Sequence, residues 1–134
     1  MSEYCKVKTH IDSREDLTAA LQELGVKFEV GEDLELTGHW GRHSSREMRS
    51  AEIAIRRETL SERPSNDIGY RKGADGCYEL VIVDVDEYRL RDFVNRVAQR
   101  AARHKALRQA RRLGYAVVSQ RQAGQVLQLE LRRM

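Results

Sequence analysis

The residues that decide the fold are 78–113, which read YELVIVDVDEYRLRDFVNRVAQRAARHKALRQARRL. In residues 78–83, apolar side chains occupy both the odd-numbered and the even-numbered positions, and so both faces of a strand. This pattern predicts a strand in the interior of a sheet that is covered on its two faces. From about Tyr88 to Leu113 the apolar period lengthens to that of a helix, and Gly114 marks its end. The stretch therefore predicts an interior strand followed by a long helix.

The predicted long helix changes character along its length. In its first half, at about 100° per residue, Phe93 and Val97 face a core while arginines occupy the neighbouring face. Beyond Ala101 the apolar face rotates by about half a turn. Two alternatives follow: the helix bends or breaks near residues 102–104, or its second half leaves the sheet and is covered by another element or another chain.

The remaining segments complete an α+β pattern. Residues 5–11 predict a strand, and a helix follows, capped by Asp12 or Ser13 and ended by Gly25. Alternation then predicts a hairpin over 26–36 around Gly31, strands at 51–55 and 68–70, and a closing hairpin (115–119 and 125–131) around Gly124. We expect one domain, residues 1–134, with a mostly antiparallel sheet and two helices packed on one face, ferredoxin-like in general layout.

Charge is distributed unevenly along the 134 residues. Residues 88–113 hold nine arginines and lysines against Asp92 alone, so the net charge of +3 divides into +8 in this segment and −5 elsewhere. The two cysteines, Cys5 and Cys77, form no CxxC pair, and no apolar leader precedes them, which favours reduced thiols and a cytoplasmic location. No apolar run approaches the length of a membrane span.

The basic helix is the first candidate site. We interpret it as a surface for a protein partner or for self-association; the alternatives are an RNA- or phosphate-binding surface and a simply solvated face. No nucleic-acid motif supports RNA, and the arginine stripe contains no aromatic side chain on which bases would stack. The candidate partner-binding residues are Arg96, Arg100, Arg103, Leu107 and Arg108.

A second candidate is a polar patch near the sheet, although ordinary exposed charges on a strand explain it equally well. It comprises Asp67, Tyr70, Arg71, Tyr78 and Trp40. A small enzyme built on Asp67, Tyr70 and Arg71 would require a deep pocket that encloses all three side chains. His39 and His43 lie in a glycine-flanked loop, where their spacing does not make a metal site. No nucleophile, metal or cofactor set is recognised, so we expect no cofactor.

Four segments resemble a known family: YCKVKTHI (4–11), LTGHWGRHSSREMRSAEIAI (36–55), DIGYRKGADGCYELVIVD (67–84) and DFVNRVAQRAARHKALRQARRLGYAVV (92–118). The family is called hypothetical chloroplast reading frame thirty-five and occurs in algal plastids, cyanobacteria and other bacteria. The resemblance implies a compact α+β domain without an established activity or catalytic residues to transfer. The sequence therefore favours a non-enzymatic cytoplasmic binding or adaptor module acting through the basic long helix.

Overall fold

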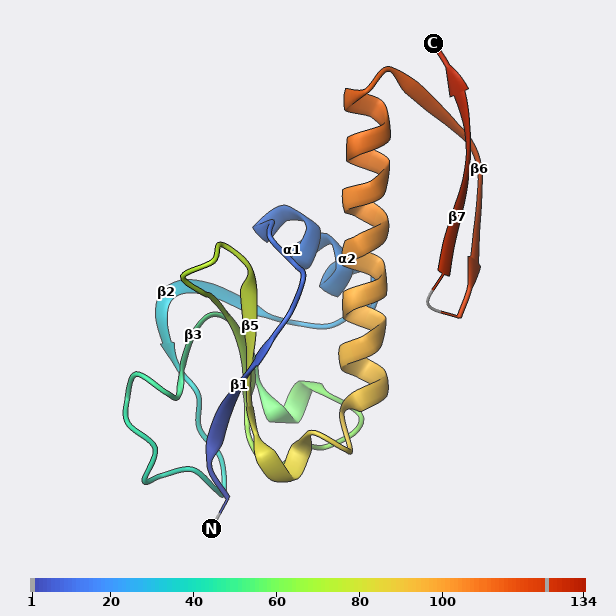
Figure 1. The fold of residues 1–134 in the computed structure, drawn as a ribbon. Helices are drawn as coiled ribbons and strands as arrows, with labels where there is room; N and C mark the ends of the chain where they lie inside the picture. The colour runs from blue at the N-terminus through green and yellow to red at the C-terminus, as the bar shows by residue number, and fades with distance from the viewer. Residues whose placement is uncertain (1, 125) are drawn as a thin grey trace.

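The computed structural model describes residues 2–124 and 126–134, and its main feature is a five-stranded antiparallel sheet (Figure 1). The strand order is β1-β5-β4-β3-β2. Two helices and a separate two-stranded sheet, β6-β7, complete the fold, which confirms the predicted α+β class. The bounds are β1 Tyr4–Lys8, α1 Arg14–Glu23, β2 Glu29–Glu35, β3 Ser50–Ile55, η1 Arg57–Thr59, β4 Ile68–Lys72, β5 Tyr78–Val83, η2 Asp84–Asp86, α2 Arg91–Arg112, β6 Tyr115–Ala123 and β7 Val126–Arg133.

The main core lies between the sheet and both helices. Leu17 and Leu21 of α1 and Val97 of α2 pack with side chains of β3, β4 and β5. A smaller cluster, which includes Val81 and Val83, lies on the opposite face of the sheet. Strand β5 pairs with both β1 and β4, and its side chains belong to the two clusters on opposite faces of the sheet, which confirms the predicted interior strand.

The helix boundaries follow their local sequence signals. Ser13 caps α1, because its Oγ accepts a hydrogen bond from the backbone N–H of Asp16 at 3.3 Å. Gly25 follows the helix with φ +70°, a left-handed conformation that favours glycine. Helix α2 is continuous from Arg91 to Arg112 and is drawn without a kink in Figure 1, so the first alternative, a bend or break near residues 102–104, is wrong. Instead, its second half extends past the sheet, with the β6-β7 hairpin beside it (Figure 1).

Residues 26–36 do not form the predicted hairpin. They contribute a single strand, β2, which lies at the edge of the sheet, pairs with β3 and contains a register shift between Val30 and Leu34. Gly31 therefore sits in an irregular strand, because a bulge absorbs the extra residues without reversing the chain. The closing hairpin is present as β6-β7; its second strand was predicted to begin at Gln125, which lies outside the described residues, and β7 begins at Val126.

Within residues 2–124 and 126–134, no helix combines the length and the apolar character that crossing a bilayer requires.

Candidate functional site

One side of α2 is held against α1 by ion pairs. Glu23 of α1 contacts His104 and also accepts from Arg100 Nη1 at 3.4 Å, and Arg108 pairs with the buried Asp16. Burial raises the pKa of Glu23, but the hydrogen bond from His104 and the nearby arginines outweigh it and hold this pKa below its ordinary value. Polar side chains thus replace the apolar face beyond Ala101 because their partners on α1 are acidic.

Another side of α2 faces the β6-β7 hairpin across a cleft of about 680 Å³. Arg103 Nε donates to Gln120 Oε1 at 2.7 Å and so links the helix to β6. None of the described residues that line the cleft is acidic, and Leu127 supplies its apolar wall. The lining residues are Arg96, Gln99, Arg100, Arg103, Gln120, Gln122 and Leu127.

This α2–hairpin cleft suits an anionic group. Guanidinium groups are permanently charged and match carboxylates and phosphates through two parallel hydrogen bonds. Arg100 forms an ion pair with Glu23, which also contacts His104, whereas Arg96 has no hydrogen bond or ion pair among the described residues. The glutamine amides add both donors and acceptors. The cleft therefore offers positive charge together with neutral hydrogen-bonding groups.

The predicted basic-helix residues divide between these two sides of α2. Arg96, Arg100 and Arg103 come together at the cleft, whereas Arg108 turns toward α1. Leu107 is half-buried, and by helix geometry it lies on the same face as the cleft arginines, the face that β6 approaches. Sequence reasoning missed the hairpin's share of the site; alternation places Gln120 and Gln122 on one face of β6, but only the fold shows what that face meets.

The five residues of the predicted polar patch do not share a surface. Tyr70 and Tyr78 are each 1% exposed and belong to the core beneath the helices. Arg71 follows Tyr70 on the same strand and so faces the other side of the sheet, where it bonds Ser50 Oγ. The Tyr70 hydroxyl is buried without a hydrogen-bond partner among the described residues, and burial raises its pKa. Because the Tyr70 side chain lies in the core and the Arg71 side chain lies on the opposite side of the sheet, the described positions of Asp67, Tyr70 and Arg71 do not bring the three side chains into one pocket.

Asp67 ends a loop and organises the backbone around it. Its Oδ1 accepts from the backbone N–H of Arg57 at 2.9 Å. Its Oδ2 accepts from the backbone N–H of Thr37 and from Arg56 Nη1, each at 3.0 Å. Both carboxylate oxygens of this buried residue are thus occupied by structural hydrogen bonds, which joins β4 to the segments after β2 and β3.

Trp40 is held by its backbone while its side chain stays half-exposed. Asn66 Oδ1 accepts from the Trp40 N–H at 3.1 Å, and Asn66 Nδ2 donates to the Trp40 carbonyl at 2.7 Å. The carboxylate of Asp86 in turn accepts from the backbone N–H groups of Ser65 at 3.0 Å and Asn66 at 3.2 Å. The loop that carries Trp40 is thereby tied to η2 through residues that sequence reasoning did not single out.

A second groove, of about 540 Å³, runs between β1 and α2. Its floor is mostly apolar and includes Val7, Leu80 and Val94, and alanines of α2 form one wall. No arginine lines it, so the two hollows beside α2 differ in chemistry. Over the part of the chain that the structure describes, no three or more His, Cys, Asp or Glu residues are grouped so that they could hold a metal ion.

The model of a family described as "Protein of unknown function (DUF1257)" matches residues 20–128. These residues include the loop that carries Trp40 (residues 37–49), all of α2 and most of the hairpin. No curated protein and no solved structure gives a significant match.

Proposed function

This chain belongs to the DUF1257 family of proteins of unknown function, and we propose that it is a non-enzymatic binding module that holds an acidic protein segment in the α2–hairpin cleft. The observation that carries the proposal is the convergence of three arginines on one cleft whose lining contains no acidic side chain. We also propose that the chain is related to the family of hypothetical chloroplast reading frame thirty-five. The proposal takes residues 1–134 as a single domain and places the protein in the cytoplasm.

The hairpin favours a protein segment as the ligand. Within residues 2–124 and 126–134, strands β6 and β7 pair only with each other, so each keeps an outer edge of unpaired backbone groups. A two-stranded sheet is marginally stable by itself, and an extended peptide that adds a strand would extend its hydrogen-bonded ladder. The cleft is less suited to binding RNA, because none of the described residues that line it is aromatic and could stack on a base.

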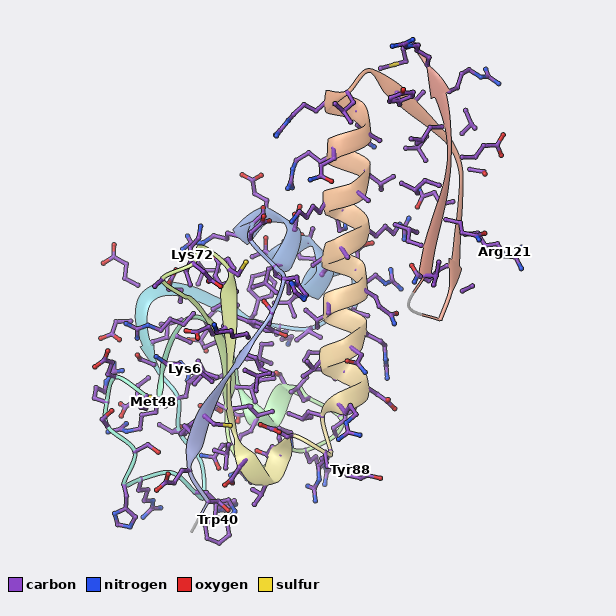
Figure 2. The ribbon with its side chains drawn as sticks, in the orientation of Figure 1. Lys6, Trp40, Met48, Lys72, Tyr88 and Arg121 are labelled. Atoms are coloured by element: carbon purple, nitrogen blue, oxygen red, sulfur yellow. The ribbon has the colours of Figure 1, made fainter. Side chains whose placement is uncertain are left out.

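The test measures binding of a fluorescently labelled poly-glutamate peptide by anisotropy, with a generic single-stranded RNA titrated in parallel. The cleft variant is Arg96→Gln/Arg100→Gln/Arg103→Gln. The matched control removes the same charge away from the cleft, in Arg91→Gln/Arg111→Gln/Arg121→Gln; Arg121 points away from α2 (Figure 2). Circular dichroism confirms that both variants keep their helices.

We expect the cleft variant to lose at least about tenfold in peptide affinity, which is only about 1.4 kcal/mol, less than one charged hydrogen bond contributes. The control should change less than about threefold. Equal losses in both variants would show non-specific attraction to net charge. Tighter binding of the RNA, with a steep salt dependence, would replace the proposal with a nucleic-acid function.

A further inference from the structure

The outer edge of β1 carries unpaired backbone groups. Strand β1 lies at one end of the sheet, and in the described part of the chain it pairs with β5 alone. The Tyr4 N–H points away from β5, because it donates to Ser44 Oγ at 3.2 Å. Backbone groups of alternate residues point the same way in an antiparallel ladder, so those of Lys6 and Lys8 also point away from β5. Among the described residues, these groups of Lys6 and Lys8 have no hydrogen-bond partner on that edge.

This edge opens into the groove of about 540 Å³ beside α2, whose size falls in the range of roughly 300 to 1,000 Å³ that ligand pockets occupy. Residues 7–10 line the groove consecutively. Because consecutive side chains of a strand point to opposite faces, the groove meets this segment at its edge. Ala98, Ala102 and Ala106 lie four residues apart on the facing side of α2, and their short side chains leave room for another chain.

We infer that this groove binds an extended segment of a partner protein, which adds to β1 as a further strand of the main sheet. Backbone hydrogen bonds to the strand edge supply affinity in such complexes, and pockets for alternate side chains supply specificity. One face of the added strand meets the mostly apolar floor beneath α2, so it requires apolar side chains. The inference is independent of the proposed function, because the groove lies on a different side of α2 from the hairpin and shares only Gln99 with the cleft (Figure 1).

The lysines of β1 favour acidic side chains on the other face of the added strand. Cys5 packs against the core beneath the helices, so by alternation Lys6 and Lys8 point to the opposite face of the sheet. Of the lysines in the described residues, only Lys105 forms an ion pair; Lys8 lies opposite Glu79 in the register without pairing with it. Pairing β1 with β1 of a second copy would set lysines beside lysines, which repel each other. The charge therefore favours a different, acidic partner segment.

The ionisable groups that line the groove support the same choice. The acidic groups already have partners on α2, in the ion pairs Asp12–Lys105 and Asp16–Arg108. His10 is exposed beside Lys8, whereas the carboxylate of Glu87 lies near the start of β1. We therefore place an acidic side chain of the partner segment at the Lys8 end of β1.

Backbone hydrogen exchange of the full chain tests the strand pairing. The probe is a short peptide of alternating valine and glutamate with blocked ends. Without it, the amides of Lys6 and Lys8 should exchange rapidly, whereas those of Cys5 and Val7, which face β5, should be protected. At peptide concentrations that saturate binding, exchange at Lys6 and Lys8 should slow about tenfold or more. No binding, or unchanged exchange at both lysines, would overturn the inference, and so would protection without peptide that disappears on dilution, which would show a second copy on the edge.

Backbone methylation of the peptide separates strand pairing from simple apolar contact. In an extended peptide the valine N–H groups point to one edge and the glutamate N–H groups to the other. One peptide is N-methylated on its valines and a second on its glutamates. Because only one edge can pair with β1, one of the two should lose about tenfold or more in affinity while the other binds as the parent does. Equal losses in both peptides, or a loss in neither, would contradict strand addition.

Variants of the protein locate the binding in the groove. Ala102→Trp fills the groove and should weaken peptide binding about tenfold or more, whereas Ala74→Trp, at an exposed alanine in the turn after β4, should leave it unchanged. Lys8→Gln should weaken binding about threefold, and Lys27→Gln, at an exposed lysine outside the groove, should not. The cleft variant should bind the peptide at the groove as the wild type does, so the failure of one site leaves the other intact. Equal effects of the two tryptophan substitutions, or loss of the Lys6 and Lys8 protection in the cleft variant, would overturn the inference.

Discussion

Replacing Asp67 by asparagine should destabilise the fold strongly, although the two side chains have nearly the same shape. The Asp67 side chain is only 4% exposed, and each of its two oxygens accepts from a backbone N–H, at 2.9 Å from Arg57 and 3.0 Å from Thr37. An amide has one acceptor oxygen, so in either orientation its NH₂ group faces a backbone donor. The variant also removes the negative charge that pairs with Arg56.

The expected loss of unfolding free energy is about 3 to 5 kcal/mol, which combines a lost charged hydrogen bond with an unsatisfied buried donor. At a urea slope of about 2 kcal/mol per molar, a loss of 3 kcal/mol lowers the unfolding midpoint by about 1.5 M. The assay is urea unfolding followed by circular dichroism, with Asp33→Asn as the control, because Asp33 forms only an exposed pair with Arg46. A midpoint for Asp67→Asn within about 0.3 M of that control would refute the structural role of Asp67.

Three further outcomes follow from the same contacts. Gly38→Ala should lower the urea midpoint and increase the mobility of Trp40 in fluorescence anisotropy, because its Cβ would meet Asn66 backbone and side-chain atoms at 2.4 to 2.5 Å. Burial and the bond to a neighbouring carboxylate raise the pKa of the Cys5 thiol to about 11, so in a Cys77→Ser variant alkylation should stay slow at pH 9 and accelerate toward pH 11. Over that interval stability should fall, because the unfolded thiol ionises first, near its ordinary pKa of 9.0. The pKa of Glu23 lies below its ordinary 4.5, so its stabilising effect is present above that pH and is lost on acidification; Glu23→Gln should flatten the acid limb of stability measured by urea unfolding.

The sequence predicted the elements whose signals are local. The Ser13 cap, the glycine after α1 and the doubly apolar strand β5 each depend on neighbouring residues, and the structure confirms all three. The prediction of a hairpin over residues 26–36 failed because a glycine followed by two acidic residues is equally compatible with a bulge in a continuous strand. The choice between a hairpin and a bulged strand depends on the pairing of β2 with β3, which is distant in the sequence, so local signals could not decide it.

The candidate site was predictable only on the helix side. Periodicity placed Arg96, Arg100 and Arg103 on one face, but it did not show that the hairpin would fold back to form a cleft with them. The Trp40 clamp was missed for a similar reason, since Asn66 lies 26 residues from Trp40 along the chain. From the sequence alone, a polar residue such as Asn66 is predicted to be an ordinary loop residue. Its buried hydrogen bonds are evident only when the fold shows which residues surround it.

The central claim is that the α2–hairpin cleft receives an acidic segment, and side-chain NMR tests it most directly. Titration with the poly-glutamate peptide should shift the Nε–Hε resonances of Arg96 and Arg103 and the side-chain amide of Gln122, all of which line the cleft. The corresponding resonances of Arg91 and Arg121, outside the cleft, should remain in place. Shifts of equal size at all five residues, or none at the cleft residues, would contradict the claim.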